Sequence, residues 1–125
     1  MEGAKTRALL KKVRTAYPAA FVYKINDRTR SGIPDSVLCF DNKHVWCEFK
    51  ELRIKTVPSP LQVSHALTEI QKMTIAAMLR TGMSVMVVVF VGSQHYVFTA
   101  TRHNGLQWCM DLTLLDILGV LWNRS

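Results

Sequence analysis

The chain has 125 residues, of which 49% are hydrophobic and 20% are charged. This composition is typical of a globular protein, and the length predicts one domain over residues 1–125 with a buried core and no room for a second domain. The apolar runs are too short to span a bilayer, and no charged segment followed by a long apolar one opens the chain. We therefore expect a cytoplasmic protein that does not bind membranes. The net charge of +7 favours an anionic partner such as a phosphate backbone.

The first half of the chain predicts a helix followed by three strands. Residues 4–17 carry apolar side chains at helical spacing with Lys and Arg on the other side, and Pro18 ends the pattern. Alternating apolar residues then indicate strands, the last two of which form a hairpin. We expect strands at residues 21–25, 37–40 and 45–50. A polar, basic loop at 26–32 joins the first two strands, and a turn at 41–44 joins the last two.

The next segment predicts a loop and then a long helix. Residues 52–64 contain two prolines and show weak periodicity, so we expect a mobile loop. Residues 66–81 have helical periodicity, and Gly82 supplies a C-terminal stop. We expect one side of this helix to pack on the sheet, namely Leu67, Ile70, Met73, Ala77 and Met78.

The last third predicts strands followed by a helix. The apolar, β-branched run 84–91 is typical of a strand buried on both faces, and 95–99 is expected to pair with it through a turn. Residues 107–110 are a possible strand, and Thr113 fits a capping box before a final helix that extends to about Trp122. The fold class is therefore α/β or α+β, with a mixed central sheet of about five strands flanked by helices.

Two short motifs carry the functional interpretation. Gly32-Ile33-Pro34-Asp35 leads into the first strand of the predicted hairpin, and Glu48-Phe49-Lys50 lies near the end of its second strand. Because side chains alternate along a strand, Glu48 and Lys50 should share a face, and Asp35 can reach the same corner of the sheet.

Two converging carboxylates repel each other. A hard divalent cation such as Mg²⁺ bound between them makes their proximity favourable. Such an ion can activate water and neutralise phosphate charge, while a nearby lysine stabilises developing negative charge. The alternative is an ordinary turn at Pro34-Asp35 and a solvent-facing ion pair between Glu48 and Lys50.

The soft metal ligands show no comparable pattern. Cys39, Cys47 and Cys109 lie in apolar surroundings without CxxC spacing, so we expect buried thiols. The four histidines form neither HxH nor HExxH, and a zinc site is not expected.

Basic residues cluster on both sides of the motifs. Arg28 and Arg30 precede the aspartate, and Arg53 and Lys55 follow the lysine, so we expect these four to contact DNA phosphates. The first helix carries a further basic group that favours the same kind of partner, with solubility as the alternative, at Lys5, Arg7, Lys11, Lys12 and Arg14.

Together, the element order, Pro34-Asp35 and Glu48-Phe49-Lys50 resemble the PD-(D/E)XK nuclease superfamily. Within it the chain looks most like the VRR-NUC group and small viral junction-resolvase-like nucleases, in which a basic loop leads into Gly-x-Pro-Asp. The resemblance covers roughly residues 1–91. It implies a restriction-endonuclease-like core and, if the chain is viral, a location in the host cytoplasm.

The resemblance also implies roles for individual residues. Asp35 and Glu48 would bind Mg²⁺ or Mn²⁺ together with the backbone carbonyl of Phe49, and Lys50 would act on the water or the phosphate. The glutamine that the family places on the following helix is best matched by Gln71, with Gln62 as a weaker candidate. The family's glutamate on the first helix has only Glu2 as a counterpart. Either Glu2 lies on an ordered first turn, or the acidic cluster lacks one carboxylate.

The function expected from these features is metal-dependent endonucleolytic hydrolysis of DNA, specific for branched DNA or a Holliday junction. A small domain has little surface for reading a long sequence, which favours recognition of shape and charge. The alternatives are a general nicking or repair nuclease, a non-catalytic basic DNA-binding module and, disfavoured by the positive charge, a nuclease inhibitor. A homodimer is also expected, because 112–122 is unusually apolar for a chain end and a junction offers two strands to cut.

Overall fold

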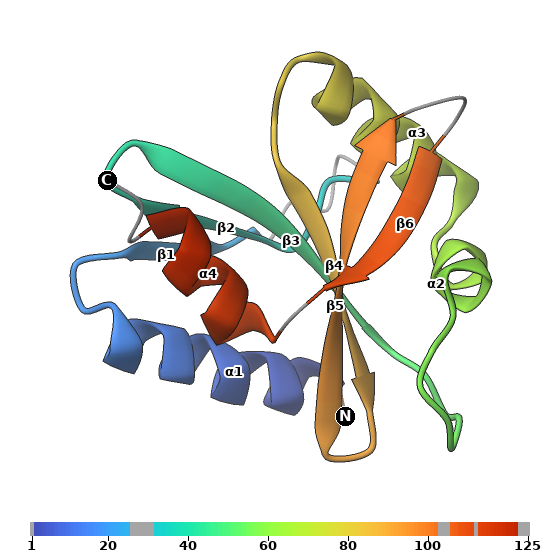
Figure 1. Ribbon diagram of the computed structural model, residues 1–125, viewed down its shortest axis with the longest axis horizontal. Coiled ribbons are helices and arrows are strands. Elements are labelled where there is room, and N and C mark those ends of the chain that lie inside the picture. The colour runs from blue at the N-terminus through green and yellow to red at the C-terminus, as the bar shows by residue number, and fades with distance from the viewer. Residues whose placement is uncertain (1, 26–31, 103–105, 112, 123–125) are drawn as a thin grey trace.

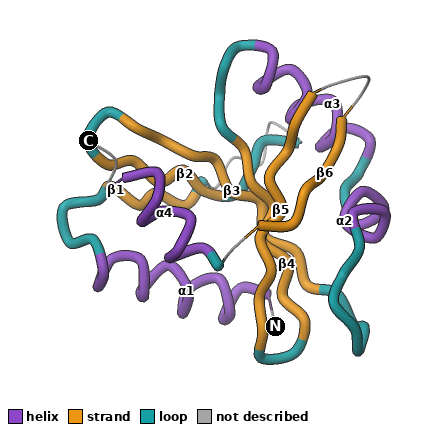
Figure 2. The backbone as a smooth tube through the Cα atoms, viewed as in Figure 1, coloured by secondary structure: helices purple, strands orange, loops and turns teal. Residues whose placement is uncertain are grey.

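A computed structural model describes residues 2–25, 32–102, 106–111 and 113–122. These residues form four helices and a six-stranded sheet in which the strands follow the order of the chain (Figures 1 and 2). The elements are α1 (Glu2–Ala16), β1 (Phe21–Lys24), β2 (Ser36–Phe40), β3 (Lys43–Glu51), α2 (Pro60–Ala66), α3 (Glu69–Arg80), β4 (Val85–Val91), β5 (Gln94–Arg102), β6 (Leu106–Asp111) and α4 (Leu114–Trp122).

The sheet is mixed because one pair of neighbouring strands is parallel. β3 and β4 run in the same direction, and α2 and α3 form the crossover between them. The other neighbouring strands pair antiparallel. The predicted mixed sheet flanked by helices is thus confirmed, with six strands among the described residues instead of about five.

The two faces of the sheet carry separate cores, and the helices divide between them (Figure 1). Apolar residues of α1 and α4 cover one face, where Cys47 and Phe49 are fully buried. Those of α2 and α3 cover the other face, where Val87 and Phe98 are fully buried. We call the second face, which also carries Glu48 and Lys50, the α3 face, because alternation along β3 turns these two residues toward it.

The hairpin of β2 and β3 forms as predicted, but its turn is shorter than the expected 41–44 because β3 already begins at Lys43. Phe40 pairs with Lys43, so the connection consists of Asp41 and Asn42, both of which have positive φ. Residues with short polar side chains tolerate this conformation better than most, which is why two-residue hairpin turns favour them. The turn fixes the register that places Ser36 opposite Cys47.

The predicted loop over 52–64 is wrong in its last part, where α2 begins. Ser59 caps this helix by accepting a hydrogen bond from the backbone N–H of Gln62, and Pro60 occupies the first turn. Proline is compatible with that position because the first N–H groups of a helix have no intrahelical acceptor. A proline taken as a breaker therefore marks a helix start.

The predicted packing face of the following helix is also wrong in part. The chain is extended at Leu67, so the helical pattern divides into α2 and α3. Within α3 the buried residue is Ile75, whereas Ile70 and Met73 are 53% and 70% exposed. The N-terminal half of α3 therefore presents apolar side chains to solvent.

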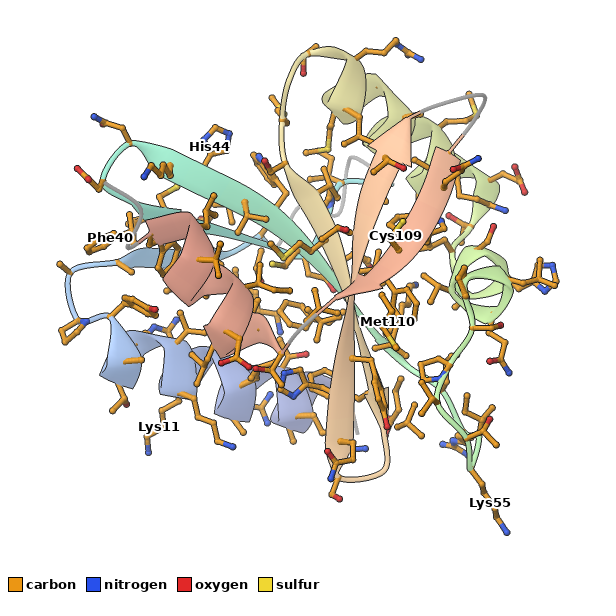
Figure 3. The ribbon with its side chains drawn as sticks, viewed as in Figure 1. Lys11, Phe40, His44, Lys55, Cys109 and Met110 are labelled. Atoms are coloured by element: carbon orange, nitrogen blue, oxygen red, sulfur yellow. The ribbon has the colours of Figure 1, made fainter. Side chains whose placement is uncertain are left out.

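The apolar end of the chain is core. α4 buries Leu114, Leu118 and Trp122 against the sheet and α1, and the Trp122 ring meets Tyr17 edge-on at 4.9 Å between centroids. The composition of this segment therefore no longer supports a dimer. The expectation of three buried thiols holds for Cys47 alone, since Cys39 is half-buried and Cys109 is exposed on β6 (Figure 3).

Candidate active site

Both predicted carboxylates lie where β2 and β3 pair. Asp35 immediately precedes β2, and its Oδ2 accepts a hydrogen bond of 3.2 Å from the backbone N–H of Phe49 on β3. Its own backbone carbonyl accepts a hydrogen bond of 2.6 Å from Ile25 N, just after β1. Asp35 is thereby held beside the peptide group that follows Glu48.

Glu48 is a buried carboxylate in contact with two polar side chains. Its side chain is 5% exposed, and its Oε2 lies 3.7 Å from Lys50 Nζ and accepts a hydrogen bond of 3.3 Å from Gln71 Nε2. A carboxylate removed from water requires such partners, because burial disfavours its charge. The alternative of a solvent-facing ion pair between Glu48 and Lys50 is therefore wrong, because Glu48 is buried.

Gln71 joins the start of α3 to the sheet. Thr68 caps this helix, and Gln71 Oε1 accepts a hydrogen bond of 2.9 Å from Thr68 N while its backbone N–H donates to Thr68 Oγ1. The amide nitrogen on the same side chain then points to Glu48. One glutamine thus orients both the helix cap and the carboxylate.

Gln62 provides an internal comparison. It occupies the same position in the capping box of α2, where Ser59 and Gln62 exchange the two equivalent hydrogen bonds. Of these two candidates from the sequence, the structure brings Gln71 to Glu48. Thr68 is a site residue that the sequence analysis did not identify, although its Thr-x-x-Gln spacing is the signature of a capping box.

Gly32 sets the distance between the Pro34-Asp35 turn and α3. Its φ is +91°, and a Cβ at this position would lie 2.5 Å from Thr74 Oγ1 and 2.8 Å from the carbonyl oxygen of Ile70. Only glycine accepts both that conformation and that approach to a helix backbone. The turn that carries Asp35 is therefore packed directly on the helix that carries Gln71.

Cys47 lies behind the site and stays protonated. Burial, with a smaller effect from the nearby Asp35 charge, raises the pKa of its thiol to about 12. Its side chain is fully buried in the core on the opposite face of the sheet from Glu48, so it does not face the candidate metal-binding side. The ligands available at this corner are therefore oxygen atoms.

The donor set fits a hard divalent cation. Among the described residues, no three or more His, Cys, Asp or Glu side chains gather as a ligand group. Mg²⁺ does not need such a group, since it is commonly held by one or two carboxylates together with water and phosphate oxygens. Asp35 and Glu48 supply carboxylate oxygens of the kind that such an ion binds.

The remaining predicted site residues are less closely placed. Phe49 lies in β3 directly after Glu48. Helix α1 begins at Glu2, but the side chain of Glu2 lies outside what the structure describes. The first turns of α1 adjoin the end of β3 on the opposite face, where Lys5 pairs with Glu51. A contribution from Glu2 and from the Phe49 carbonyl stays a prediction.

Two of the four basic residues expected to contact DNA can be placed. Arg53 and Lys55 are exposed in the connection after β3, and Lys55 extends away from the body of the molecule (Figure 3). Arg28 and Arg30 lie outside the described residues. None of the helices in the described segments combines the length and apolar character that crossing a membrane requires.

No protein-family model matches the chain. No curated protein matches it either. Among solved structures it is similar to Hjc from Archaeoglobus fulgidus, a Holliday junction resolvase from an archaeal hyperthermophile, with a TM-score of 0.52, 16% sequence identity and 86% of each chain covered. At this identity the likeness concerns the fold alone, and it confirms the predicted fold class: the chain has the mixed α+β fold of this resolvase.

Proposed function

We propose that this chain is a metal-dependent endodeoxyribonuclease that hydrolyses phosphodiester bonds in branched DNA. The observation that carries the proposal is the buried Glu48 carboxylate, which contacts Lys50 and Gln71 and lies one residue from the peptide group bound by Asp35. The fold likeness to a Holliday junction resolvase supports branched DNA as the substrate class.

Each residue has a definite task in this proposal. Asp35 and Glu48 would hold Mg²⁺ or Mn²⁺, with the Phe49 carbonyl as a further ligand. Glu2 is the counterpart of the family's first-helix glutamate, and either it completes the acidic cluster or the cluster lacks one carboxylate. The bound ion supplies charge neutralisation at the phosphate and a lowered pKa for water. Lys50 Nζ stabilises the charge that develops on the phosphate oxygens. Gln71 holds Glu48 Oε2 by a hydrogen bond, so that the Glu48 carboxylate is already oriented before a metal ion binds.

The finer features of the proposal rest on the sequence motifs. The order of Gly-x-Pro-Asp, acidic-x-Lys and the helix glutamine supports a relationship to the VRR-NUC group and to small viral nucleases. Arg28, Arg30, Arg53 and Lys55 would contact phosphates on either side of the cut. A homodimer, now proposed only from the two-fold symmetry of a junction, would present one site to each of two strands.

The test is cleavage of labelled four-way junctions, flaps, single strands and duplexes with Mg²⁺, Mn²⁺ or EDTA. Glu48→Gln should lower the cleavage rate at least about 100-fold while DNA binding persists, and Lys50→Ala should cause a similar loss. Glu51→Gln is the matched control, because Glu51 lies on the same strand but pairs with Lys5 on the opposite face. Wild-type cleavage by a folded Glu48→Gln protein would refute the mechanism, and binding without cleavage would favour a DNA-binding module.

A further inference from the structure

Two aromatic side chains lie exposed on the edge strand β1. Phe21 is 58% exposed and Tyr23 is 53% exposed, and their rings are nearly parallel, with 5.8 Å between centroids and 13° between planes. Aromatic side chains are among the largest apolar groups that a core can bury, yet these two face solvent together. The proposed mechanism does not use them.

Both rings lie on the α3 face of the sheet. Val22, the residue between them, packs against the core on the opposite face. Alternation along β1 therefore directs Phe21 and Tyr23 to the side that carries Glu48 and Lys50. The aromatic pair and the carboxylate site share one surface.

The strand register gives the separation between the pair and the site. Tyr23 lies opposite Val37 of β2, which in turn lies opposite Trp46 of β3, two residues before Glu48. Two strand spacings of about 4.8 Å and two residues of about 3.3 Å place Tyr23 about 12 Å from Glu48 along the sheet. That distance equals the rise of about three to four nucleotides of one B-form strand at about 3.4 Å each, and of fewer nucleotides in an extended single strand.

We propose that Phe21 and Tyr23 form a stacking surface for unpaired bases next to the cut phosphate. This inference rests on the proposed function and names the feature of branched DNA that the enzyme reads. Aromatic rings accept any base because every base has a π-face, and unpaired bases are available where strands exchange or separate. The positive charge of the chain and the exposed Lys24 next to Tyr23 suit a DNA strand better than an apolar protein partner.

The test compares Phe21→Ala/Tyr23→Ala with the wild type in EDTA, where cleavage is absent. Affinity for a labelled oligothymidine of about 20 nucleotides should fall about tenfold or more, because each stacked base contributes substantially. Affinity for a fully paired duplex of equal length should change less than about twofold. A 2-aminopurine placed in the single strand should be quenched by the wild type and not by the variant.

Two controls separate stacking from loss of exposed apolar surface. Met110→Ala removes a side chain that is 52% exposed on the opposite edge strand, β6, and should leave both affinities unchanged (Figure 3). Phe21→Tyr/Tyr23→Phe retains both rings and should retain binding and quenching. Circular dichroism establishes that each variant is folded.

The outcomes distinguish this inference from the proposed nuclease. Equal loss on both DNAs, or no loss, overturns the stacking surface even if the wild type cleaves junctions. The double alanine variant can lose affinity for the single strand alone while the wild type never cleaves DNA. That result supports the stacking surface and refutes the nuclease. A wild-type dimer that becomes a monomer in the double alanine variant, without selective loss of single-strand binding, assigns the pair to self-association and overturns the inference.

Discussion

Replacing Gln71 by Glu tests whether this side chain positions a metal-binding carboxylate. The substitution keeps an oxygen that can accept the hydrogen bond from Thr68 N, but it exchanges the amide that donates to Glu48 for a second carboxylate. Two negative charges about 3.3 Å apart repel by about 5 kcal/mol at an effective dielectric constant of about 20. One carboxyl can escape by binding a proton, which at pH 7 costs up to about 4 kcal/mol. We therefore expect a loss of about 2–4 kcal/mol in the free energy of unfolding.

Thermal unfolding in EDTA and in saturating Mg²⁺ measures the effect. In EDTA the Gln71→Glu protein should melt about 10 °C below the wild type. In Mg²⁺ the difference in melting temperature should disappear. The third carboxylate, which repels Glu48 in EDTA, then serves as an additional ligand of the bound ion. Gln62→Glu is the matched control: it changes the same position of the other capping box, and a negative charge in a first turn is neutral or favourable. Equal melting of the two variants in EDTA would refute the contact with Glu48, and a difference that persists in Mg²⁺ would refute the metal.

Three further substitutions test individual packing and hydrogen-bond contacts in the fold. Gly32→Ala should lower the free energy of unfolding in urea by about 2–4 kcal/mol, because a Cβ meets the Ile70 carbonyl; Gly82→Ala, with similar φ and nothing described within 4 Å, should cost only about 1 kcal/mol. His95 Nε2 accepts a hydrogen bond from the backbone N–H of Leu114, and its pKa is lowered, mainly by burial and less by Lys12. Because the unfolded state binds a proton on His95 more readily than the folded state does, the free energy of unfolding should be constant above about pH 7 and fall below about pH 6.5. Thermal melts should show this pH dependence in the wild type and not in His95→Gln. Ser36→Ala should raise the melting temperature, with a gain of up to about 1 kcal/mol, because the buried Ser36 Oγ has no hydrogen-bond partner among the described residues; a loss would contradict this account.

The sequence was informative where one physical rule decides the structure. Alternation and a turn tolerant of positive φ define the hairpin of β2 and β3, and they place Glu48 and Lys50 on one face. The continuous apolar, valine-rich run at 85–91 predicts a strand covered on both sides, as observed. These features depend on neighbours that are near in sequence.

The sequence was less informative where two interpretations of one residue compete. Pro60 can end a helix or begin one, and only the Ser59 cap resolves the choice. The helical periodicity over 66–81 contains two apolar stripes, and the break at Leu67 decides that Ile75 is buried while Met73 is exposed. Gln71 and Gln62 have the same local pattern, so their different surroundings follow from packing between distant segments.

The parallel pairing of β3 with β4 has a consequence for the order in which the chain assembles. Asp35, Glu48 and Lys50 belong to segments joined by a two-residue turn, so they can meet as soon as the hairpin forms. Gln71 reaches Glu48 only after the crossover through α2 and α3 has closed, and such long loops form slowly. We expect a ribosome-bound chain that ends before β4 to hold the carboxylates without their glutamine partner.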